Sequence, residues 1–280
     1  TTGGGNVAVG HEALDANTSA SDNVAIGRAS MSENTTGAYN TAVGRSTLAT
    51  NTTGAYNVAI GRQALNLNTE GDNNVAIGPN ALVANTTADN NTAIGRNSLT
   101  ANTTGTYNIS IGHESSQSNT TGSYNTVVGG KAMDACTTGA KNVAIGYGAL
   151  TDLTTGEGNC AVGENCAADI TTGGSNVAMG MDALRVVTTA SYNTGIGKDA
   201  GKSVSTGENN TCLGVSAGTS ASPSGNITTG SHNFVLGNND VTNLYCADTS
   251  ISSSDARDKT DVEDFKYGLS WITELRPVTY

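Results

Sequence analysis

The chain has 280 residues and a formal net charge of −11, and only about one residue in six is Val, Ile, Leu or Phe. The acidic balance argues against a nucleic-acid-binding protein, which would need a basic patch. No apolar run of about 18 residues is present, so neither a transmembrane helix nor membrane insertion is predicted. Such a composition would indicate disorder if the apolar residues were not confined to fixed positions of a repeat.

A repeat of 17 residues begins almost at the first residue of the chain. The sequence starts at Thr1 without a Met and already in phase with the repeat, which suggests a piece or a processed product of a longer protein. A last start, Asn233, follows after a repeat of 23 residues. An unbroken period of this kind is typical of stacked repeats. The thirteen regular units begin at Asn6, Asn23, Asn40, Asn57, Asn74, Asn91, Asn108, Asn125, Asn142, Asn159, Asn176, Asn193 and Asn210.

The first five columns of the unit, counted from this Asn, predict a short strand and a corner. Column 2 is Val, Thr or Ile, column 3 is almost always Ala, column 4 is mostly Ile or Val, and column 5 is Gly in every unit. Columns 2 and 4 should lie on one face of the strand and column 3 on the other, because successive side chains alternate. The fixed Gly indicates a positive φ or a close backbone approach.

The remaining columns predict an extended segment and a turn. Column 8 is small and column 9 is mostly Leu or Met, which we interpret as a second short strand or extended segment with one large inward anchor. Columns 13 to 15 read Thr-Thr-Gly in most units, which is typical of a turn. The Asn of column 1 is interpreted as a stacked amide ladder or a cap on backbone groups, in preference to a polar stripe for a ligand.

The repeat therefore predicts an all-β fold, a parallel β-solenoid or β-roll of thirteen 17-residue repeats. At ~4.8 Å per coil it would be roughly 60 Å long. Because one chain has few apolar columns, we expect three parallel chains, intertwined or side by side, that share a core on a three-fold axis. The chain is thus predicted to associate with two further copies of itself in a homotrimer.

Column 12 changes once along the chain, from Asn to Cys and then to apolar residues. If this column faces the trimer axis, its amide rings could bind water or an anion. Alternatively, the column faces solvent and the late apolar residues mark a contact patch. The residues are Asn17, Asn34, Asn51, Asn68, Asn85, Asn102 and Asn119, followed by Cys136, Leu153, Ile170, Val187 and Val204.

Column 6 carries positive charge in many units, including Arg28, Arg45, Arg62 and Arg96. These side chains are expected to form a solvated face or, alternatively, a basic groove for an anionic surface glycan. Tyrosines are frequent in column 17 and would suit sugar rings or form packing ladders. No paired carboxylates stand out as an acid/base couple for glycan cleavage.

The five cysteines are interpreted as small buried thiols, with an inter-chain disulfide as the alternative. No CxxC pair exists and only three His are present, so neither a metal site nor a cofactor is predicted.

The composition divides the chain into three parts. The regular repeat covers residues 1–218, an irregular insertion with a last strand signal covers 219–249, and a charged segment covers 250–280. In the last part apolar residues recur at spacings of 4, 3 and 3, which predicts a short α-helix that ends before Pro277. These residues are Phe265, Leu269, Ile272 and Leu275.

The pattern Ser254-Asp255-x-Arg257-x-Lys259, the helix and the closing Leu-Arg-Pro-Val-Thr-Tyr resemble the start of the intramolecular chaperone domain of bacteriophage tail fibres and tail spikes, the peptidase S74 family. The resemblance covers residues from about 250 to 280. It implies a trimeric fibre whose chaperone releases itself by cutting between Ser254 and Asp255.

The same resemblance implies that Ser254 is the nucleophile, that Lys259 is its base and that Asp255 and Arg257 orient the pair. A Ser hydroxyl needs such a neighbouring base, and a Lys with a lowered pKa can serve. The sequence departs from the family at Asp258, where a hydrophobic residue is usual, and it ends before most of such a domain. The alternative is a helical cap without chemistry.

The repeat also resembles the β-solenoid stems of phage fibres and, more loosely, the β-roll heads of trimeric autotransporter adhesins. The first resemblance implies an extracellular fibre segment of a virion that binds host-surface glycan or protein, or spaces the fibre tip from the particle. The second implies a bacterial surface adhesin. An enzyme, such as a glycan-degrading tail spike, is the third hypothesis.

Overall fold

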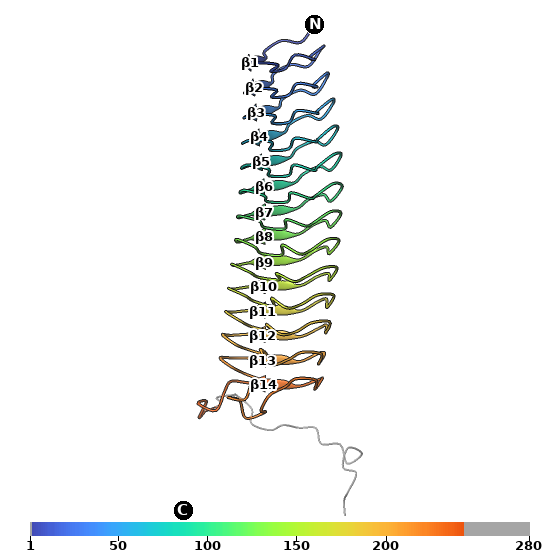
Figure 1. Ribbon diagram of the computed structural model, residues 1–280. Coiled ribbons are helices and arrows are strands. Elements are labelled where there is room, and N and C mark those ends of the chain that lie inside the picture. The colour runs from blue at the N-terminus through green and yellow to red at the C-terminus, as the bar shows by residue number, and fades with distance from the viewer. Residues whose placement is uncertain (1, 244–280) are drawn as a thin grey trace, which may run out of the picture. The chain divides into compact units, whose positions relative to one another are not determined.

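The computed structural model describes residues 2–243, and the compact unit within them ends at Val241. Fourteen strands, one in each coil, form a single sheet in which every strand is parallel to its neighbours (Figure 1). The all-β parallel solenoid is therefore confirmed. The strands are β1 (Val7–Val9), β2 (Val24–Ile26), β3 (Thr41–Val43), β4 (Val58–Ile60), β5 (Val75–Ile77), β6 (Thr92–Ile94), β7 (Ile109–Ile111), β8 (Thr126–Val128), β9 (Val143–Ile145), β10 (Cys160–Val162), β11 (Val177–Met179), β12 (Thr194–Ile196), β13 (Thr211–Leu213) and β14 (Phe234–Leu236).

Each column of the strand pairs with the same column of the next coil. Ala42 of β3, for example, is the partner of Ala59 of β4. The register survives the longer last repeat, where Thr211 of β13 pairs with Phe234 of β14. Because the sheet follows the chain order without interruption, one chain completes the stack and no strand of another chain lies between its own. Intertwined chains are therefore not needed to form the sheet.

Column 3 faces the interior of the coil. Ala25, Ala42 and Ala59 are fully buried, whereas Val58 and Ile60 on either side of Ala59 point outward and remain partly exposed. The predicted alternation along the strand is confirmed. The small Ala side chains leave room for the large residues of column 9, so the interior is filled from the opposite wall.

The residues of column 9 are that opposite wall, but they do not lie in a second strand. Leu48 and Leu65 are completely buried, which confirms the large inward anchor. Their segment is a turn in which every second residue has a positive φ, 58° at Gln63 and 53° at Leu65. A left-handed Leu costs roughly 1–2 kcal/mol, which is about what burial of its side chain contributes. The prediction of a second strand is wrong because the curled backbone aims the large side chain inward without one.

The Gly of column 5 forms the predicted corner. Gly61 has a φ of 125°, and a Cβ built there would lie 2.8 Å from the carbonyl carbon of Gly78 in the next coil. Both the left-handed backbone and the close stacking of coils therefore require glycine.

The Asn of column 1 is an internal ladder, as predicted. The side-chain oxygen of Asn40 accepts a hydrogen bond from the backbone N–H of Asn57 at 2.9 Å. The Nδ2 of Asn57 in turn donates to the carbonyl oxygen of Gly71 at 2.8 Å, across the interior of the coil. Each Asn thus joins one coil to its neighbour and also closes its own coil.

Column 12 forms a second ladder beside the first. The Nδ2 of Asn68 donates to the Oδ1 of Asn51 at 2.9 Å and to the carbonyl oxygen of Gly71 at 3.0 Å. Five of the seven side chains are fully buried and one is 1% exposed, while that of Asn17 in the first coil is half-buried. This corrects the expectation of an axis between chains, because the amides lie inside one coil and bond to each other and to the backbone, which leaves no open ring for water or an anion.

A layer of serines divides the interior into two apolar cores. One core extends from Leu14 to Leu99 and the other from Val127 to Val235. Between them, the coil that contains β7 has Ser in columns 3, 8 and 9. The hydroxyls of Ser110 and Ser115 lie 2.7 Å apart, within hydrogen-bonding distance.

The irregular insertion closes a last coil. Residues 219–241 belong to the same compact unit as the regular repeats, because β14 pairs with β13. The predicted C-terminal helix and the candidate residues Ser254, Asp255, Arg257 and Lys259 lie outside the described residues.

Candidate assembly surface

The outward side chains of columns 2 and 4 on β1–β14 form a continuous surface, which we call the strand face. It is mostly Val and Ile, with Thr at column 2 of five strands. The interior already has its own core, so the fold does not use this surface. Its members that are more than a third exposed are Val7, Val9, Ile26, Ile60, Ile109, Ile111, Ile145, Met179, Ile196, Phe234 and Leu236.

The strand face is long and narrow. Fourteen strands at ~4.8 Å per strand give roughly 60 Å of length, and the distance between its edges is about 15–20 Å. The resulting area, on the order of 1,000 Å², is comparable with the ~800 Å² that each partner contributes to a stable protein interface. This area is larger than the apolar patch that a monomeric protein usually exposes.

One edge of the strand face is formed by column 17, directly before each buried Asn. We call it the leading edge. The rings of Tyr39 and Tyr56 stack at 4.9 Å between centroids, and those of Tyr107 and Tyr124 at 5.2 Å. All four side chains are more than half exposed. The tyrosines therefore form ladders on the outside of the coils.

The other edge, which we call the trailing edge, is column 6, directly after the corner Gly. Arg28, Arg45, Arg62 and Arg96 are all exposed there. Within residues 2–243, none of these four arginines is in an ion pair. The guanidinium group of Arg62 donates to the Oε1 of Gln63 at 3.0 Å. The predicted alignment of the arginines is thus observed, but they line a convex edge and not a groove.

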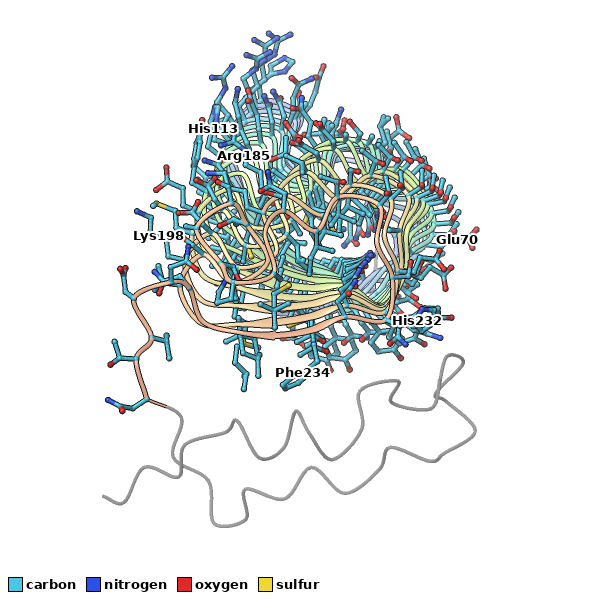
Figure 2. All side chains as sticks on the ribbon, turned by 90° about the horizontal axis from the view of Figure 1, so that it is seen from below. Glu70, His113, Arg185, Lys198, His232 and Phe234 are labelled. Atoms are coloured by element: carbon cyan, nitrogen blue, oxygen red, sulfur yellow. The ribbon has the colours of Figure 1, made fainter. Side chains whose placement is uncertain are left out.

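Figure 2 shows how the two edges flank the strand face when the stack is viewed along its length. Phe234 of the strand face lies between His232 of the leading edge and Lys198 of the trailing edge. Glu70 points to another side of the coil, away from Phe234. The apolar face therefore lies between two polar edges.

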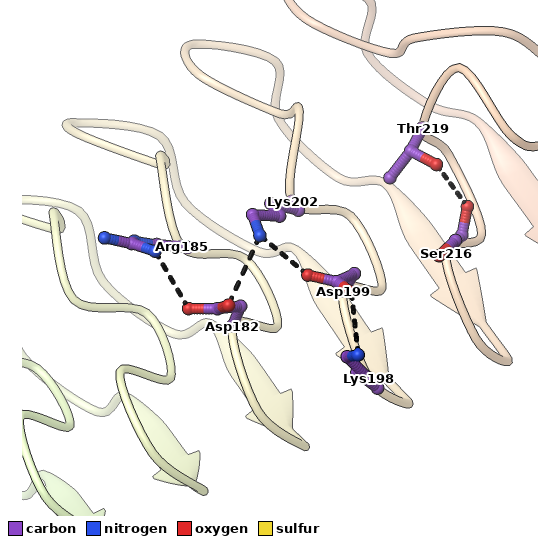
Figure 3. Close-up of polar contacts among 7 residues, drawn as sticks. All are labelled: Asp182, Arg185, Lys198, Asp199, Lys202, Ser216 and Thr219. Carbon is purple, nitrogen blue, oxygen red and sulfur yellow. Dashed lines mark hydrogen bonds and ion pairs between the residues drawn. The ribbon is translucent and has the colours of Figure 1, made fainter.

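A charged network continues the trailing edge near the last coils (Figure 3). The ammonium of Lys202 contacts Asp199 at 2.7 Å and Asp182 of the preceding coil at 3.2 Å, and Asp182 also pairs with Arg185 at 3.1 Å. The hydrogen bond that Lys202 donates to Asp199 is the main cause that raises the pKa of Lys202. The network joins adjacent coils from outside, although exposed ion pairs of this kind contribute little free energy.

Three cysteines lie inside the coils. Burial raises the pKa of Cys136 to about 11 and that of Cys166 to about 12, and it also raises the pKa of Cys212. These thiols are therefore protonated and unreactive at neutral pH, as expected of structural Cys. Cys160 differs, because it is only half-buried and occupies column 2 of the strand face.

The described residues contain no other candidate site. No pocket is found in them, and no three His, Cys, Asp or Glu side chains are placed to hold a metal ion. The same part of the chain has no helix that could span a membrane.

The sequence predicted the residues of both edges, but it did not single out the apolar surface between them as a site. The signal was column 3, which is small in all strands but β8 and β14, because Ala fits a narrow interior and leaves the larger Val and Ile for the outside. Comparison with known proteins adds no identity, since no family model, no curated protein and no solved structure matches this chain.

Proposed function

We propose that this chain is a structural segment of an extracellular fibre, a phage tail fibre or spike, built from three parallel copies that bury their strand faces against one another. The observation that carries the proposal is the continuous apolar strand face on a coil whose interior is already filled. Burial of apolar surface is the main driving force for such association.

The repeated geometry of the described residues supports a scaffold. The same strand and corner recur in every coil, so that residues 2–241 act as a rod of fixed length. In this proposal the segment spaces the fibre tip from the particle or presents it to a host-surface glycan or protein, and it is located on the virion, outside the host cell.

The assembly is tested with lysines on the strand face. In Ile60→Lys with Ile111→Lys, charge enters the proposed contact at two exposed positions, and we expect monomers with an unchanged circular dichroism spectrum. Thr53→Lys with Thr104→Lys is the matched control, because both threonines are exposed in the Thr-Thr-Gly turn of column 14. Sedimentation velocity measures the result. A wild-type chain that stays monomeric at micromolar concentration, or a face variant that associates like the control, contradicts the proposal.

Self-cleavage by an S74-type chaperone remains part of the proposal for the whole protein. Ser254→Ala and Lys259→Ala should each leave the gene product uncut, because one removes the nucleophile and the other its base. Denaturing gels of the full-length product measure this. If the wild-type product also stays intact, the chaperone role is wrong, while the assembly through the strand face is unaffected.

A further inference from the structure

The two edges of the strand face carry side chains of complementary chemistry. We propose that the copies lie side by side, parallel and in the same register, with the leading edge of one copy against the trailing edge of the next. This inference rests on the proposed assembly through the strand face and adds its partner residues, which form cation–π and ionic pairs between copies.

In five of the fourteen rows the two residues that flank the same strand are chemically complementary. Tyr56 precedes β4 and Arg62 follows it, and both are exposed. A guanidinium or ammonium group over a tyrosine ring is a favourable contact, most of all when it is shielded from water. The other rows of this kind are Asp22 and Arg28 around β2, Tyr39 and Arg45 around β3, Tyr107 and His113 around β7, and Tyr192 and Lys198 around β12.

One row has the same pair in reverse order. Lys141 precedes β9 and Tyr147 follows it, so that the cation is on the leading edge and the ring on the trailing edge. Tyr147 is 58% exposed, so nothing within its own coil requires an aromatic residue there. A swap that preserves the pair indicates that the two positions are in contact.

The contact cannot form within one chain. The two edge residues of a row are six positions apart across an extended strand, which is roughly 15–20 Å at ~3.3 Å per residue. In Figure 2, Lys198 and His232, which belong to different rows, lie on opposite sides of Phe234. The partner of each edge residue must therefore belong to a second copy.

The pairing also determines the direction of the copies. Rotation about an axis parallel to the stack brings the leading edge of one copy to the trailing edge of the next at the same height. Rotation about a perpendicular axis would instead oppose two trailing edges with the order of the rows reversed, so that no tyrosine of the leading edge would meet a cation of the trailing edge. The contacts between the two edges would then be lost.

Engineered disulfides test the register in a chain with Cys160→Val and Cys246→Ser. Val is the commonest residue at the position of Cys160 in the fourteen strands. With Tyr56→Cys and Arg62→Cys, mild oxidation should link copies covalently on non-reducing gels. The control, Tyr56→Cys with Arg96→Cys, joins rows two strands apart, about 10 Å, and should stay unlinked.

The outcomes separate this inference from the proposed function. If light scattering shows assembled particles but the same-row pair does not cross-link, the edge contact is wrong and the assembly stands. Monomeric particles overturn both. Cross-linking by His113→Cys alone, which lies near the middle of the stack, would show antiparallel copies and overturn the inference.

A swap provides a second readout. Tyr56→Arg places Arg against Arg62 of the next copy, and we expect a roughly tenfold rise in the concentration at which the particles dissociate. Tyr56→Arg with Arg62→Tyr recreates the order of Lys141 and Tyr147, and should restore the wild-type value. A double variant as weak as the single one would overturn the pairing.

Discussion

The first seven coils and the later coils have the same backbone but different interiors. Coils up to β7 contain a ladder of buried amides at column 12, whereas the coils that follow have Cys136 and then Leu, Ile and Val at this position. The strand, the corner Gly and the ladder of column 1 continue unchanged through both regions. One repeat geometry thus accommodates either a hydrogen-bonded or an apolar filling.

The amide of column 12 can be replaced by an apolar residue because the backbone carbonyl at column 15 accepts hydrogen bonds from two side-chain amides in the first region. Gly71 accepts from both Asn57 and Asn68. In the later region Gly156 still accepts from Asn142 at 3.0 Å after Leu153 has replaced the second amide. The column-15 carbonyl therefore keeps a donor, which avoids the cost of an unpaired buried polar group.

The boundary between the regions is less well satisfied. The Oδ1 of Asn119 has no hydrogen-bond partner, because Cys136 follows it in the ladder. Ser116 stands where most coils have Leu or Met, and its hydroxyl also has no partner although the residue is 1% exposed. The chain is therefore expected to open first at this coil, since local stability depends on buried apolar contacts.

The corner Gly should be equally indispensable in both regions. Gly61→Ala and Gly163→Ala each place a Cβ within 2.8 Å of backbone in the next coil, at a strongly positive φ. We expect each to lower the free energy of unfolding by about 3 kcal/mol or more. Urea denaturation measures the loss, and Gly130→Ala, where the nearest atom lies at 3.6 Å, is the neutral control. A tolerated change at either corner would show that the coils are not equivalent.

An amide in the apolar region should be nearly as harmful. In Leu153→Asn the side chain would face Cys136 and Ile170, which supply no amide partners, and a buried Leu is lost. The expected loss in the free energy of unfolding is about 3 kcal/mol. Equilibrium denaturation with urea measures it. A loss below about 1 kcal/mol would mean that the two interiors are interchangeable residue by residue.

The reverse exchange in the amide region should cost less. Asn68→Leu leaves the Oδ1 of Asn51 and one donor of Asn85 without partners, but it adds apolar burial that offsets part of the loss. We expect about 2 kcal/mol. Amide hydrogen exchange should show the loss in the coils around β4 and β5 and not in those around β10. Uniform weakening along the stack would contradict a ladder of local bonds.

Joining the two cores should stabilise the chain. Ser116→Leu restores the usual residue of column 9 between Leu99 and Met133 and removes a hydroxyl without a partner. A gain of about 1 kcal/mol is expected. It should appear as slower hydrogen exchange at β7 and β8, with Ser116→Ala as the control that removes the hydroxyl without filling the space. A destabilised Leu variant would show that the serine layer has no room for it.

The smallest effect concerns a half-buried carboxylate of the later coils. Burial, and then the charge of Asp152, raise the pKa of Asp169 above its ordinary value of 3.8. The folded state therefore binds this proton more tightly, so wild-type stability falls as pH rises from 3.8 through the raised pKa. Asp169→Asn should raise the melting temperature slightly at neutral pH and not below the ordinary pKa. An equal shift at both pH values would contradict this cause.

The sequence predicted the features that each coil repeats. It did not predict the features that depend on how the backbone curves to close the coil. The strand, the Gly corner and the inward Leu follow from alternation and from residues with one backbone preference. The second strand was wrong because the positive φ of residues such as Leu65 has no sequence signal in a non-Gly residue. The amides of column 12 were placed between chains because their partners, such as the carbonyl of Gly71, are visible only once the coil closes.

The most direct test of the account is the mass of the assembled particle. Multi-angle light scattering of the wild-type chain at micromolar concentration should give three times 28.1 kDa, because the strand face is apolar along its whole length and has no partner within its own coil. A particle of 28.1 kDa would contradict the assembly, and with it the use of the strand face and of both edges.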